Sequence, residues 1–291
     1  MPLNVWDAAL IAVKMVVYAA TLGASGAAFF RGYSGALVAG SESLKIRRIV
    51  LGLSALSVLA GAAQIMVAAG SMSGHASGLW DGSLLHMVWQ AGAGRAAVIR
   101  TLGLLLAAVA IWWDRTTWLA CLGAATAATS FAWTGHARAL NPDVLPMLLQ
   151  SIHLLGVAFW LGALPALLIV ARGGALPRIA AAAARFGAAA VWVVGGLVAA
   201  GLMLLWMLLG DLTALWTSKY GRYMMLKLIL VACLLCAAAF NKLRLTPRML
   251  AGDLRAVETL RASIRLELLS GGLILAVTAT LTTVAGPPAL D

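Results

Sequence analysis

Residues 184–209 read ARFGAAAVWVVGGLVAAGLMLLWMLL, and Arg185 is their only charged residue. The hydrocarbon core of a bilayer is ~30 Å thick, and about 20 apolar residues in a helix cross it. A helix satisfies all its backbone hydrogen bonds internally, as a chain in lipid must. This stretch therefore predicts a transmembrane helix.

The whole chain shares this apolar character. Of its 291 residues, 63% are hydrophobic and 11% are charged, with a mean hydropathy of +0.96. Soluble domains contain about 45–50% apolar and about 25% charged residues. We therefore expect an all-α integral membrane protein, a single polytopic domain over residues 1–291. Its apolar runs predict about eight transmembrane helices, at residues 5–30, 49–70, 95–113, 117–135, 145–170, 184–209, 221–240 and 264–285.

Positive charge predicts the orientation. A net charge of +11 is also found in nucleic-acid-binding proteins, but here the Lys and Arg residues flank apolar runs. The expected partner is therefore the lipid bilayer, with no nucleic acid. Most of these residues lie in 31–48, 171–184 and 241–263, which the positive-inside rule places in the cytoplasm, with both termini on the other side. Apolar residues at helical spacing within 241–263 predict an amphipathic helix lying on the inner leaflet.

Two segments resemble each other closely enough to suggest a repeat. GRAAVIRTLGLLLAAVAIWWDR begins at Gly94, and GRYMMLKLILVACLLCAAAFNK begins at Gly221. At one constant offset, Arg95 matches Arg222 and Arg100 matches Lys227, and we expect Arg95 and Arg100 at the outer end of their helix. Four helices separate the copies, so both point the same way through the membrane. The pattern predicts a parallel duplication of a four-helix unit, with halves of approximately 1–140 and 141–291.

His153 is the leading candidate for chemistry, because polar groups inside lipid are costly and functional by default. It lies about eight residues into the predicted helix 145–170, and two interpretations stay open. It is either a core histidine bonded to a neighbouring helix or a ligand of a soft metal or of haem. Imidazole and thioether groups suit copper, especially Cu(I), although a single methionine more often only packs. The candidate ligands, all in the outer half, are His153, His136, His86, His75, Met147, Met203 and Met207.

Other buried polar residues suggest further contacts. Cys121, Cys233 and Cys236 fall in the inner half. Such a gradient from methionine and histidine to cysteine would suit inward passage of Cu(I), although packing as small residues is the better explanation of the cysteines. Lys14 is expected to pair with a polar group in the bundle, and Glu267 with a buried cation. Neither a nucleotide-binding motif nor a soluble catalytic motif occurs in the sequence, so we do not expect an enzyme.

Four segments together resemble the copper resistance protein D (CopD) family of bacterial inner membranes. They are TGHA at 134–137, HLLGVAFWLGALPALL at 153–168, YGR at 220–222 with the LKLILVACLLCAAAFNKLRLTPR that follows, and SIRLELLSGGLILAVTA at 263–279. The resemblance implies eight helices and copper handling across the inner membrane, often beside a small periplasmic copper-binding protein. His136 and His153 are motif positions. The first helix departs from the pattern, since it has Lys14 and Tyr18 but no histidine.

Two hypotheses from different classes follow. The first is a copper transport and homeostasis protein that moves Cu(I) or Cu(II) between periplasm and cytoplasm, with import slightly favoured. The alternative is a membrane redox module of the cytochrome b kind that binds haem b. Bis-histidine haem ligation needs two histidines at similar depth on facing helices. A visible spectrum of the purified protein separates the two hypotheses.

Overall fold

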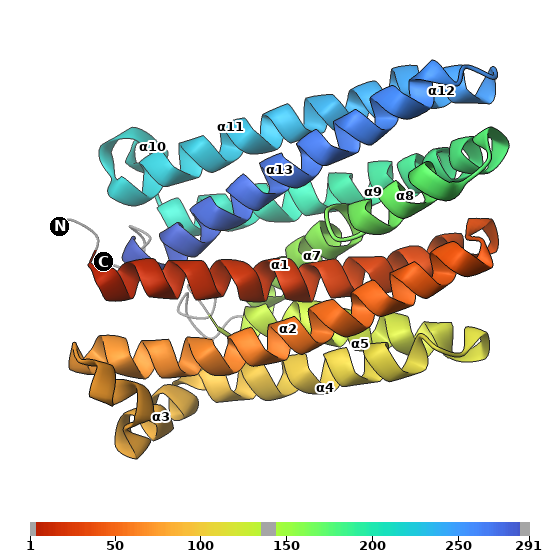
Figure 1. Cartoon of the computed structure of the whole chain (residues 1–291). Coiled ribbons are helices and arrows are strands. Elements are labelled where there is room, and N and C mark those ends of the chain that lie inside the picture. The colour runs from red at the N-terminus through yellow and green to blue at the C-terminus, as the bar shows by residue number, and fades with distance from the viewer. Residues whose placement is uncertain (1–3, 135–143, 286–291) are drawn as a thin grey trace.

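The computed structural model describes residues 4–134 and 144–285, which contain helices and no strand. Long helices run side by side along one axis, joined at both ends by short turns and brief helical segments (Figure 1). The long elements are α1 (Val5–Ser34), α2 (Gly40–Ser73), α4 (Gly94–Ala110), α5 (Thr117–Thr129), α7 (Val144–Trp160), α8 (Leu164–Gly173), α9 (Leu176–Leu209), α11 (Lys219–Phe240) and α13 (Arg255–Val284). The short ones are η1 (Gly35–Leu37), η2 (Ala76–Trp80), α3 (Gly82–Val88), η3 (Trp89–Ala93), η4 (Asp114–Thr116), η5 (Ser130–Trp133), α10 (Ala214–Thr217), η6 (Asn241–Leu245) and α12 (Thr246–Leu250).

The number of membrane passes agrees with the prediction of about eight. Within the described ranges, 7 helical stretches are long and apolar enough to cross a bilayer. The shorter α5 continues through η5 to Trp133, a length close to the lower limit of about 17 residues for a spanning helix. The start of α1 and the end of α13 lie at the same end of the bundle (Figure 1). An even number of passes is therefore required, and α5 with η5 supplies the eighth.

The predicted helix 145–170 is broken. Helix α7 ends at Trp160 and α8 begins at Leu164. Pro165 follows the break, and its missing N–H interrupts the helical hydrogen-bond ladder. Gly162 lies at this break against the backbone of α1, where a Cβ on Gly26 or on Gly162 would overlap main-chain atoms. The break therefore lets α1 cross this helix at backbone contact.

The predicted amphipathic helix on the inner leaflet is wrong. Residues 241–250 extend α11 through η6 and α12, and after a short turn Arg255 begins α13. Val257 and Leu260 are buried in the core, whereas Leu250 and Leu254 are exposed. The amphipathic pattern arises because these residues form the ends of two packed spanning helices.

Helix α1 is the centre of the bundle. It lies between one group formed by α2, α4 and α5 and another formed by α9, α11 and α13 (Figure 1), and it contacts α2, α5, α7 and α13. Its buried stretch from Ala20 to Ala28 consists almost entirely of small residues. Small side chains let membrane helices approach closely where no hydrophobic drive acts between them.

The inner ends of the helices are held by charges. Asp114 accepts hydrogen bonds from Arg31 of α1 and Arg47 of α2. Glu42 of α2, 2% exposed, pairs with Arg178 of α9 at 2.9 Å. This buried ion pair joins the two groups of helices. Helices α4 and α11 also begin at the same end of the bundle (Figure 1), as the predicted parallel repeat requires, and the duplication itself stays a prediction.

Candidate functional site

His153 lies on the face of α7 that packs against α9. Its Nδ1 is 3.2 Å from the carbonyl oxygen of Leu197. A carbonyl only accepts hydrogen bonds, so Nδ1 must carry the proton. One helical turn further along α9, Gly201 leaves room for the ring, since a Cβ there would lie 3.1 Å from Nδ1. In the neutral ring, Nε2 then keeps a lone pair. Histidines that bind a metal through one ring nitrogen often donate the N–H of the other to a backbone carbonyl in this way.

A third helix contributes a charge to the same site. Lys227 of α11 is half-buried and interacts electrostatically with His153. Helices α7, α9 and α11 thus supply an imidazole, a backbone carbonyl and an ammonium group. The hydrogen bond to Leu197 meets the expectation that His153 has a partner on another helix, and it leaves both interpretations of this histidine open.

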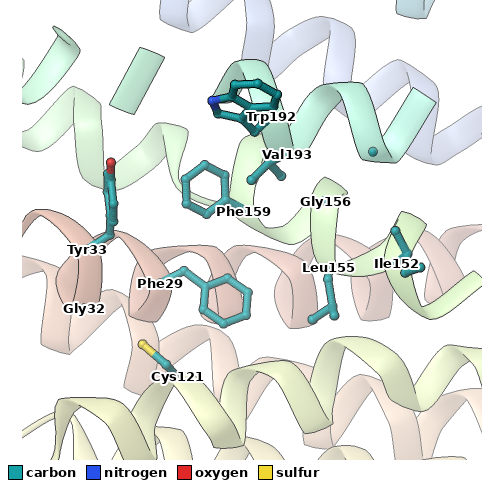
Figure 2. A pocket seen from close by; sticks show the side chains of 11 residues that line it. Phe29, Gly32, Tyr33, Cys121, Ile152, Leu155, Gly156, Phe159, Trp192 and Val193 are labelled. Atoms are coloured by element: carbon teal, nitrogen blue, oxygen red, sulfur yellow. The ribbon is translucent and has the colours of Figure 1, made fainter. Parts of the chain in front are cut away.

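An open pocket of about 660 Å³ lies beside this site; Ile152, the residue next to His153, is in its lining, and His153 itself is not. Figure 2 shows its lining, in which Gly156 of α7 and Trp192 of α9 lie on one side and Phe29 and Cys121 on the other. The walls come from α1, α5, α7 and α9 and are mostly apolar and aromatic. The Cys121 thiol is the soft ligand in this lining.

The other candidate histidines lie away from His153. His75 and His86, on the segment between α2 and α4, are exposed, and His136 lies outside the described residues. In the described part of the chain, no three His, Cys, Asp or Glu side chains are close enough to hold a metal ion together. The bis-histidine arrangement of the haem hypothesis is likewise not formed by the three histidines that the structure describes.

The candidate methionines and two of the cysteines lie in environments different from that of His153. Met147 packs against the apolar cluster around Phe131. Met203 is 49% exposed, and its spacing from Gly201 places it on a different face of α9 from the one that contacts His153. Met207 shares the face of Met203 and is partly buried. The remaining cysteines, on α11, are exposed.

A polar cluster that was not predicted from the sequence lies between α1 and α13, in the half of the bundle where α1 begins and α13 ends. Lys14 donates to the carbonyl oxygen of Thr282 at 2.8 Å and to the hydroxyl of Thr283 at 3.0 Å, which confirms that it pairs within the bundle. The Tyr18 hydroxyl lies 3.4 Å from that of Thr282. Threonines recur through 278–283, and this run of hydroxyls in a predicted spanning helix was the available signal.

Arg100 of α4 extends this cluster. Its guanidinium stacks over the ring of Phe131 at 5.4 Å, and the same ring contacts Tyr18 edge-on. The residue is 6% exposed, and its side chain passes over Gly61 of α2, where a Cβ would lie 2.8 Å from Nη2. Arg100 was placed at an outer helix end from the sequence alone, yet it is one of the most buried charges described.

Comparison with known proteins identifies two matches to family models. The model described as Copper resistance protein D-like, N-terminal domain, matches residues 5–142, and the one described as Copper resistance protein D matches residues 180–281. Neither a curated protein nor a solved structure matches the chain. The two matches leave out α7, so His153 lies between them. They confirm the resemblance drawn from the quoted segments.

Proposed function

The chain belongs to the copper resistance protein D family, and we propose that this multi-pass membrane protein carries copper across the inner membrane through the site at His153, toward the cytoplasm. The topology proposed has both termini in the periplasm, in accord with the Lys and Arg residues at the adjoining ends of α1 and α2 and of α8 and α9.

The observation that carries the proposal is that His153 follows Ile152, which lines the pocket that contains Cys121. Nδ1 of His153 is engaged by the Leu197 carbonyl oxygen, which leaves Nε2 to bind Cu(I). Neutral imidazole binds copper in either oxidation state, and a thiolate binds Cu(I) more strongly. An ion that moves from His153 to Cys121 therefore passes from a weaker to a stronger soft ligand, which favours import.

Entry to this route begins at the outer surface. His75 and His86 are exposed there, beside Met72 and Met87, which are 53% and 54% exposed. Exposed imidazole and thioether groups suit transient capture of copper or its transfer from a small periplasmic copper-binding protein. In this proposal they collect the ion, and His153 is the first ligand within the bundle.

A pair of substitutions at His153 tests the proposal. In His153→Asn the amide nitrogen takes the place of Nδ1, so the bond to Leu197 is retained while Nε2 is lost. His153→Gln instead keeps a polar group near the position of Nε2. We expect His153→Asn to fold normally and to lose most copper accumulation in cells that express the protein.

Leu154→Ala is the matched control, because Leu154 is buried in the neighbouring cluster and carries no ligand. It should lower the melting temperature, and copper accumulation should stay proportional to the amount of folded protein. Normal accumulation in a well-folded His153→Asn variant would refute His153 as a ligand. A fall in cellular copper when the wild-type protein is expressed would refute the proposed direction of transport.

A further inference from the structure

Glu267 is a buried carboxyl group without a cationic partner. It lies on α13 in the inner half and is 2% exposed. The Asn241 amide nitrogen of η6 donates a hydrogen bond to its Oε1, and Ser263 supplies a second side-chain hydrogen bond. None of the ion pairs formed within residues 4–134 and 144–285 includes Glu267. The cation expected to pair with it from the sequence is replaced by a neutral amide.

This carboxyl group lines a cavity of about 340 Å³ between α8, α9, α11 and α13. Residues from α7, α8, α9, α11 and α12 that face the cavity carry no ionisable side chain, and the two ionisable residues in its lining are Glu267 and Lys242 of η6. The stem of Lys242 packs on Gly187, and the residue is exposed. Its ammonium group therefore stays at the mouth of the cavity, in solvent.

Asn241 presents an unsatisfied acceptor at the same place. Its Oδ1 is buried and has no hydrogen-bond partner among the described atoms. Asn241 begins the π-helical segment η6, a distortion that often occurs at functional sites because it turns a side chain out of the regular helical register. A carboxylate and an amide oxygen together require a positively charged or hydrogen-donating species.

Glu42 shows how a buried carboxylate with a cationic partner is held in this protein. It is as buried as Glu267, but Arg178 lies 2.9 Å away and the Ala39 N–H donates to its other oxygen. A buried carboxylate without such a counter-charge is costly, and the usual relief is to take up a proton. Oxygen ligands of this kind are also poor partners for Cu(I).

We propose that Glu267 is a reversible proton-binding site that exchanges protons through the inner cavity. On protonation, the carboxylate takes a proton from a hydronium ion that enters the cavity: one O–H bond forms on the carboxyl group, one O–H bond of the hydronium ion breaks, and water remains. The new O–H donates to Oδ1 of Asn241 after the amide rotates, and in the ionised state the amide nitrogen donates to the carboxylate. Asn241 thus serves both states, which explains why an amide stands here rather than a lysine or an arginine.

Infrared spectroscopy of the full chain in lipid vesicles tests this site directly. The C=O stretch of a protonated carboxyl group in an apolar environment should grow as the pH falls and should be missing from Glu267→Gln at every pH. Glu267→Gln has the size and hydrogen-bonding capacity of the protonated acid, so it should fold as the wild type does. Glu267→Asp, which keeps a carboxyl group, provides a second variant in which a shifted band should return.

Glu42→Gln is the matched control, and its spectrum should retain the band because Glu42 is paired with Arg178. A pH-dependent band that persists in Glu267→Gln, or no such band in the wild type, would overturn the proposal. The test requires no copper, so it stands or falls separately from the function proposed for His153.

Discussion

Helices α4 and α11 begin with the same Gly-Arg pair and run in the same direction, yet they are packed differently. Gly103 of α4 meets Gly123 of α5, and a Cβ on either residue would overlap the backbone of the other helix. In α11 the large residues Leu226 and Ile229 are 45% and 61% exposed, which places them against lipid. The buried residues of α4 are Gly94, Ala96, Arg100, Gly103, Leu104, Ala107, Ala108 and Ala110, whereas those of α11 are Tyr220, Gly221 and Leu234.

This difference shows that size, more than polarity, decides how a spanning helix packs. Lipid is as apolar as leucine, so burial of a leucine against another helix gains little, and close backbone approach decides the contact. The two cations at matching positions differ in burial, as their helices do. Arg100 is enclosed beside Phe131, whereas Lys227 is half-buried beside His153.

The largest expected effect comes from Gly103→Val, which forces α4 away from α5. Its Cβ would lie 2.6 Å from the Ala127 nitrogen and from the Gly123 oxygen, and backbone atoms cannot rotate aside. We expect a loss of about 3 kcal/mol in stability, measured by unfolding in detergent. The matched change Leu230→Val on α11 should have little effect. Equal losses in both variants would remove the contrast between the two helices.

An intermediate effect is expected at the two matched cations. Arg100→Ala removes a desolvated cation–π contact with Phe131 and leaves a gap over Gly61, so it should cost about 2 kcal/mol. Lys227→Ala should change stability by less than about 1 kcal/mol, as is usual away from packed features. Melting temperatures of the two variants, measured in the same lipid, provide the comparison. A larger loss for Lys227→Ala would show that α11 is the tightly held helix.

The smallest effect is expected at the inner turn before α13. Hydrogen bonds from Arg248 hold the pKa of Asp253 below its usual range. The stabilisation is therefore present above the unfolded pKa of about 3.9 and is lost as the pH falls through the lower folded value. Asp253→Asn should lower the melting temperature slightly at pH 7, and the difference from wild type should shrink toward pH 3.

Asp114→Asn is the control for that turn. Asp114 contacts α1 and α2 through Arg31 and Arg47. Asp114→Asn should therefore lower the stability more than Asp253→Asn does, by about 1 kcal/mol or less. A melting temperature of Asp253→Asn that falls further than that of Asp114→Asn would show that the turn before α13 fixes the bundle.

The candidate site was only partly predictable from the sequence. His153 stood out because a histidine in an apolar run must find a partner, but a carbonyl exposed by packing against Gly201 leaves no mark in the sequence. Met203 was chosen for its depth and type, whereas helix rotation places it on another face. Arg100 was assigned to an outer end, since its neighbours Phe131 and Gly61 are distant in the chain.

The sequence by itself determined that the chain is helical, that it lies in a membrane and how often it crosses, because each follows from the length of apolar runs and the cost of unpaired backbone in lipid. It also indicated the family, and three of the four quoted segments lie within the residues that the two family models match. Tertiary structure alone decided which helix faces meet. Rotation and close approach depend on small residues from separate helices, such as Gly26 with Gly162 and Gly103 with Gly123, and hydropathy does not record them. The same contacts decided that Glu42 has a counter-charge and that Glu267 has an amide instead.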